Sequence, residues 1–169
     1  MTTERSLPSP SADERTMLTG YLDFHRATLA IKCDGLTDTQ LRQQAAPPSA
    51  LSLLGLVRHM AEIEKFWFRA LLTGEPVRGI WAPGPDLDLD AAFQEVETAS
   101  TADAFAAWHA ECENSRKLAN AAESLDAGGE LLGTTCTLRF ALIHMIEEYA
   151  RHNGHADLLR ERIDGQTGQ

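Results

Sequence analysis

The residues best suited to chemistry lie near the end of the chain, where Glu148 precedes His152 by four positions. In a helix this spacing places the two side chains one turn apart on the same face, so that both can reach one ion. Carboxylate oxygen and imidazole nitrogen are ligands that zinc and other divalent transition metals accept. The alternative is an ordinary surface pair, which is worth about 0.5 kcal/mol in a helix. Spacing alone leaves both interpretations open.

The helix that carries this pair is predicted from Thr137 to Ile163. Core-facing residues recur there at steps of three and four, which is the pattern of an amphipathic helix in a bundle. These positions are Leu142, Met145, Tyr149, His152, Ala156, Leu159 and Ile163. A buried imidazole or carboxylate without a partner costs several kcal/mol, roughly. The pattern therefore predicts a partner for His152.

A third candidate ligand, His59, lies in the second long helical segment, which ends at Gly74. Helical bundles build metal sites from side chains that point inward from facing helices. His59, Glu148 and His152 together supply three ligands and leave a fourth position open, which is typical of catalytic rather than structural zinc. The alternative for His59 is a partly buried ring that is hydrogen-bonded to the backbone or to Glu62.

Four long helical segments with almost no strand alternation predict an all-α fold, a four-helix bundle with a long loop between the second and third helices. Ser, Thr and Asp residues that cap helices mark the expected starts. They are Ser11 or Asp13, Thr37, Ser49 or Ser52, Ser100 or Thr101, and Thr137. Residues 1–11 are expected to be a disordered tail, and residues 12–165 a single domain.

Composition excludes several classes of protein. The chain has 169 residues and a net charge of -10, which disfavours nucleic acid and anionic membranes as partners. No segment approaches the ~20 apolar residues of a membrane span, so a soluble cytoplasmic protein is expected. Cys33, Cys112 and Cys136 form no CxxC motif, and neither a disulfide framework nor a cysteine zinc site is indicated.

Two stretches resemble the DinB-like family of metalloenzymes, in particular its actinobacterial branch. They are ALSLLGLVRHMAEIEKFWF, which begins at Ala50, and LIHMIEEYARHNGHADLLRERIDG, which begins at Leu142. The resemblance implies a four-helix bundle whose metal is bound by one histidine of the second helix, matched by His59, and by two residues four apart on the last helix. His152 matches the last position. Many relatives have histidine where this chain has Glu148, but mycothiol-dependent isomerases are similar in using His, Glu and His.

The same resemblance implies a transferase that joins a low-molecular-weight thiol, such as mycothiol or bacillithiol, to an electrophile, with a role in detoxification. Zinc is the expected metal, with nickel and iron as alternatives. A free thiol has a pKa near ~8.5, whereas a zinc-bound thiol is deprotonated, so the chemistry is coherent. The alternatives are a metal-dependent hydrolase or isomerase that activates water, and a non-catalytic stress protein that binds metal or another ligand.

Three further residues are candidates for supporting roles. His155 could assist the metal ligands or transfer a proton. Arg151 could contact an anionic group of the thiol, and Trp81, in the loop of residues 74–90, could form a lid. Arg58 and Arg160 could bind such a group as well, and solvated charges are the expectation for all three arginines.

His144 and His25 are expected to be structural. A homodimer is also expected, because the resemblance implies one and because the predicted third helix has an apolar face.

Overall fold

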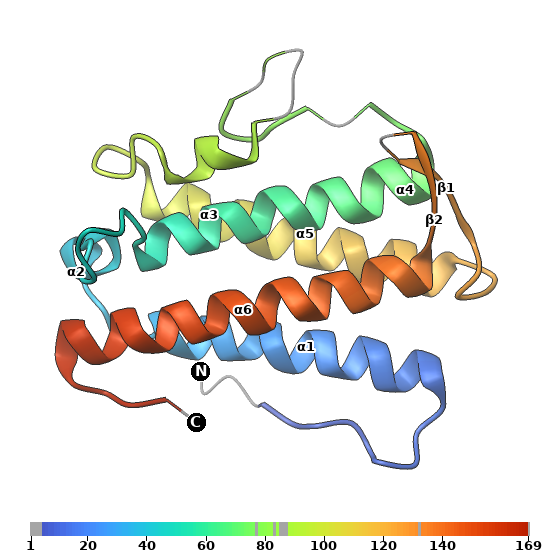
Figure 1. Ribbon diagram of the computed structural model, residues 1–169, viewed down its shortest axis with the longest axis horizontal. Coiled ribbons are helices and arrows are strands. Elements are labelled where there is room, and N and C mark those ends of the chain that lie inside the picture. The colour runs from blue at the N-terminus through green and yellow to red at the C-terminus, as the bar shows by residue number, and fades with distance from the viewer. Residues whose placement is uncertain (1–4, 77, 83, 85–87, 132, 169) are drawn as a thin grey trace. The chain divides into compact units, whose positions relative to one another are not determined.

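The computed structural model describes residues 5–76, 78–82, 84, 88–131 and 133–168. The described residues are mostly helical and include one small sheet, so the prediction of an all-α fold is confirmed (Figure 1). The helices are α1 Glu14–Cys33, α2 Asp38–Arg42, α3 Leu53–Glu64, α4 Leu71–Thr73, α5 Thr101–Ala121 and α6 Leu138–Asp164. A π-helical turn, Lys65–Ala70, joins α3 to α4, and a 3-10 turn covers Leu89–Phe93. Positions 1–4 of the expected tail and 77, 83 and 85–87 of the expected loop lie outside the described residues.

Side-chain caps explain where the helices begin. In each case a side-chain oxygen accepts a hydrogen bond from the backbone amide three residues further on, which satisfies one of the unpaired amides of the first turn. The capping residues are Asp13, Thr37, Ser52, Ser100 and Thr137. These five caps confirm the predicted helix starts.

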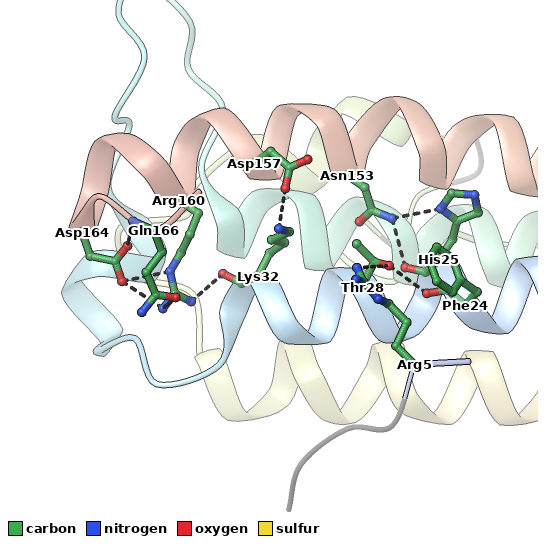
Figure 2. A network of polar contacts seen from close by, with 10 residues as sticks. All are labelled: Arg5, Phe24, His25, Thr28, Lys32, Asn153, Asp157, Arg160, Asp164 and Gln166. Atoms are coloured by element: carbon green, nitrogen blue, oxygen red, sulfur yellow. Dashed lines mark hydrogen bonds and ion pairs between the residues drawn. The ribbon is translucent and has the colours of Figure 1, made fainter. Parts of the chain in front are cut away.

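The chain divides into two compact units, and the first comprises Met1–Leu56 with Leu142–Gln169. In this unit α1 and α6 lie side by side, joined by polar contacts (Figures 1 and 2). The Nη1 of Arg160 donates to the carbonyl oxygens of Lys32, at 3.0 Å, and Asp34, at 2.8 Å. Arg160 is only 6% exposed, so its prediction as a solvated charge was wrong. The guanidinium is buried because it satisfies carbonyl groups that the end of α1 leaves unpaired.

Two more contacts join the same helices. The Nζ of Lys32 lies 2.6 Å from the Oδ1 of Asp157, and the Nδ2 of Asn153 donates to the carbonyl oxygen of His25 at 3.0 Å. Figure 2 shows these contacts in line along α1 and α6. They fix the register of α6 against α1 over the half of α6 that follows Glu148.

The second unit comprises Val57–Ala141. Here α5 packs against the π-helical turn, where Arg69 forms two hydrogen bonds of 3.0 Å to the carboxylate of Glu111. Strands β1, Gly128–Leu131, and β2, Thr134–Thr137, pair antiparallel. A small apolar core in this unit contains Phe66, Leu71, Leu131 and Ala141.

No helix in the described part of the chain is long and apolar enough to cross a membrane. All three cysteines are free thiols, with Cys33 and Cys112 buried and Cys136 half-buried. Burial raises the pKa of the Cys33 thiol to about 12, so this thiol stays protonated at neutral pH.

Candidate metal centre

Four half-buried side chains of α6 form a continuous cluster in the first unit, which we call the histidine edge: His144, Glu148, His152 and His155. Glu148 lies at its middle. Its Oε1 is 3.6 Å from the Nε2 of His144, and its Oε2 is 3.4 Å from the Nε2 of His152. The helix repeat produces this arrangement, because residues four apart lie one turn above each other. The structure thus brings the predicted pair together and adds a histidine on its other side.

His155 contacts the far side of the His152 ring. The two Nδ1 atoms are 3.3 Å apart, a distance at which one ring donates a hydrogen to the other. If the Nδ1 of His152 carries that hydrogen, the Nε2 keeps its lone pair on the side of Glu148. This is the tautomer that binds a metal through Nε2, and outer hydrogen bonds commonly fix it.

The separation of the Glu148 and His152 donor atoms is compatible with two ligands of one metal ion. Two donor atoms bound to one zinc at about 2.0–2.2 Å in a tetrahedron lie roughly 3.4 Å apart. The Oε2 of Glu148 and the Nε2 of His152 are 3.4 Å apart, which matches this separation. The donor set therefore fits a divalent cation.

A second grouping shares the same carboxylate. His144, Glu147 and Glu148 each offer a ligand atom, and these atoms lie within 4.8 Å of one another. His144 was expected to be structural, although it precedes Glu148 by four residues, the same spacing that singled out His152. That repeated spacing was the signal that could have identified it.

His59 belongs to the second unit, where it lies on α3. Its ring stacks on Phe93 of the 3-10 turn, with centroids 5.1 Å apart and planes inclined by 28°. The units are described separately, so the combination of His59 with Glu148 and His152 stays a prediction.

Trp81 is fixed to α3 in the second unit. Its indole Nε1 donates to the carbonyl oxygen of Arg58 at 3.0 Å, and the guanidinium of Arg58 lies 4.7 Å from the ring centroid. Arg58 is 6% exposed and donates through Nη1 to the carbonyl oxygen of Gln94 at 2.7 Å. The prediction of Arg58 as a solvated charge was therefore wrong, because two loop segments fold over its side chain.

Arg151, the candidate thiol contact, is exposed on α6 and donates through Nε to the Oε1 of Glu147 at 3.0 Å. The hydrogen bond from Arg151 holds the pKa of Glu147 below its usual value. An exposed pair of this kind exchanges readily with solvent, and Arg151 can turn toward another anion.

The helical architecture, with Glu148 and His152 in contact on the last helix, agrees with what the resemblance to the DinB-like family implies. A family model described as mycothiol-S-transferase matches residues 17–165, and the chain belongs to this family. The predicted relationship to mycothiol-dependent DinB-like enzymes is thereby confirmed. A comparison with curated proteins found no significant match.

Proposed function

We propose that this chain is a zinc-dependent S-transferase of the mycothiol type, with His59, Glu148 and His152 as metal ligands. The 3.4 Å separation of the Glu148 and His152 donor atoms, in a chain of the mycothiol-S-transferase family, is the observation that supports this function best. When bound, a divalent cation would supply a thiol of strongly lowered pKa at neutral pH, a role that nickel or iron could fill in place of zinc.

The chain's own residues have two tasks in this reaction. His155 holds His152 through the Nδ1 contact, so that the Nε2 of His152 keeps a fixed direction. The second task is to hold thiol and electrophile in contact and to exclude water. The sulfur then forms a bond to the electrophilic carbon, the leaving group departs with its bonding electrons, and the thiol proton is released to solvent.

Arg151 and Trp81 keep supporting roles in the proposal. Arg151 would contact an anionic group of the thiol, because its exposed guanidinium lies one residue before His152. Trp81 would form one wall of the electrophile pocket. A homodimer stays a prediction.

The proposal is tested by the metal content and activity of untagged protein. His59→Ala and His152→Ala are compared with wild type and with His109→Ala, which removes an exposed histidine of α5. Wild type and His109→Ala should bind about one equivalent of zinc. The two ligand variants should lose more than about 100-fold in affinity, because even outer partners of ligands contribute 10- to 100-fold.

Transfer of mycothiol to monochlorobimane, followed by bimane fluorescence, should fall in parallel with zinc content. Activity that survives without metal would contradict the proposal. Ester hydrolysis without added thiol would favour the water-activating alternative. Zinc binding without turnover of any thiol and electrophile pair would favour the non-catalytic one.

A further inference from the structure

Glu62 is a fully buried carboxylate on α3, with 0% of the residue exposed. Its Oε1 accepts hydrogen bonds from the backbone amides of two consecutive residues, Ile80 at 2.7 Å and Trp81 at 3.0 Å. Burial raises the pKa of Glu62, while the two amides act in the opposite direction. Burying a carboxylate costs free energy, so a role for Glu62 at this buried position has to be found.

The reason suggested by the geometry is the orientation of Trp81. Its backbone is held by Glu62, its indole N–H by the carbonyl oxygen of Arg58, and its ring by the guanidinium of Arg58. Each contact comes from α3, and Arg58 immediately precedes His59.

A second aromatic ring lies at the same turn of α3. Phe93 stacks on His59, and both Phe93 and Trp81 are half-buried residues. The carbonyl oxygen of Gln94, the residue after Phe93, accepts from the Nη1 of Arg58 at 2.7 Å. Arg58 therefore ties both aromatic segments to the turn that carries His59.

We propose that Trp81 and Phe93 form an aromatic wall that selects electrophiles with a flat conjugated ring, and that Glu62 is the positioning residue that keeps Trp81 in this wall. The inference rests on the proposed transferase function and names its electrophile class. Partly open aromatic faces bind flat ring systems by stacking, which is worth about 0.5–1.5 kcal/mol per pair.

A purely structural role for Glu62 makes a different prediction. If Glu62 only anchored the loop, its removal would lower stability and would affect all electrophiles equally. If it positions the wall, removal should affect flat electrophiles selectively and should leave the thiol unaffected. The two roles are therefore separated by substrate comparison and by a direct observation of Trp81.

Binding is measured first, without any reaction. Protein labelled with 5-fluorotryptophan gives a fluorine NMR signal for each tryptophan, and Trp81→Phe assigns the signal of Trp81. Addition of dimethylbimane, a flat molecule without a leaving group, should shift the Trp81 signal and reach saturation. In Glu62→Ala the signal should narrow toward that of a mobile ring, and the bimane shift should fall, whereas Glu97→Ala, at an exposed site, should behave as wild type.

Kinetics then use mycothiol with two chlorides, flat monochlorobimane and small 2-chloroacetamide. In both reactions a sulfur–carbon bond replaces the carbon–chlorine bond, chloride takes the bonding electrons, and the thiol proton enters the buffer. Glu62→Ala and Trp81→Ala should raise KM for the bimane about fivefold. KM for mycothiol and for chloroacetamide should stay unchanged. Glu62→Gln, which keeps an acceptor oxygen, should restore much of the selectivity.

Two outcomes would contradict the proposed aromatic wall. One is a Trp81 signal that dimethylbimane leaves unmoved in wild type, and another is an equal loss on both chlorides. If Glu62→Ala does not fold, Trp81→Ala, which keeps the backbone bonds to Glu62, gives the same kinetic comparison of the two chlorides. A saturable Trp81 shift in a protein without transferase activity would support the wall and reject the proposed function, so the two failures are distinguishable.

Discussion

Helix α6 carries two polar clusters that are built on different principles. The first is the histidine edge. The second, which we call the anchor cluster, consists of Asn153, Asp157 and Arg160, and it contacts α1 (Figure 2). In the anchor cluster, each member has a partner on or just after α1 at 2.6–3.0 Å, which are the distances of good hydrogen bonds, although the Nδ2 of Asn153 also lies 3.4 Å from the Nδ1 of His25. In the histidine edge, the donor atoms lie 3.3–3.6 Å apart.

The difference is between polar groups that are bonded within the fold and polar groups that, on the proposed function, bind a ligand. Arg160 has partners fixed by the protein, the carbonyl oxygens of Lys32 and Asp34 among them. Glu148 and His152 are spaced as two ligands of one ion would be. Substitution in the anchor cluster should therefore change stability, and substitution in the histidine edge should change metal binding.

The largest effect is expected from Arg160→Met. The guanidinium bonds four groups at 2.8–3.0 Å, and its loss leaves buried carbonyl oxygens of α1 without donors. We expect a loss of about 3 kcal/mol in the free energy of unfolding, which lowers Tm by about 6–12 °C. Thermal and urea unfolding measure this, with Arg116→Met on the surface of α5 as the control. If Arg160→Met kept its stability, or lost zinc without losing stability, the anchor cluster would not differ from the histidine edge in serving stability.

A smaller effect is expected from Asn153→Ala. Asn153 is 5% exposed, and the variant removes its hydrogen bond to the carbonyl oxygen of His25. The free energy of unfolding should fall by about 1–2 kcal/mol. Zinc affinity, measured by calorimetry, should stay within about twofold, although Asn153 is next to His152. Gly154→Ala, at the exposed neighbouring position, serves as the control and should not destabilise the helix. A large loss of zinc affinity in Asn153→Ala, but not in Gly154→Ala, would show that the anchor cluster also contributes to metal binding.

The features that could be predicted from the sequence are those that depend only on residues close together along the chain. The five caps follow from residue type and a spacing of three, and the contact of Glu148 with His152 follows from a spacing of four. Both are properties of one helix turn, so no knowledge of the rest of the fold is needed.

Contacts between distant segments were not predicted. Arg58 and Arg160 read as surface charges, because nothing near them in sequence shows that carbonyl groups from other segments surround them. The link from Glu62 to Trp81 spans 19 residues and a loop without periodicity. The π-helical turn at Lys65–Ala70 also leaves no clear pattern, because it alters the helix repeat over only one turn.

The smallest expected effect concerns pH and His25, a partner of the anchor cluster. Burial lowers the pKa of His25 from its ordinary value of 6.5, because the charged ring is poorly solvated there. Above pH 6.5 the ring is neutral in both the folded and the unfolded chain. As pH falls below 6.5 the unfolded chain takes up the proton first, so stability should decline until the folded pKa is passed.

His25→Gln removes this contribution. Urea midpoints of metal-free protein should therefore fall less steeply between pH 7.5 and 5.5 in the variant than in wild type, while all other histidines contribute equally to both. His109→Gln, at an exposed position of α5, should keep the slope of wild type. Equal slopes in wild type and His25→Gln would show that the ring is as well solvated in the fold as in the unfolded chain. In that case His25 would contribute to the contact with Asn153 through its carbonyl oxygen, and its ring would add nothing to stability.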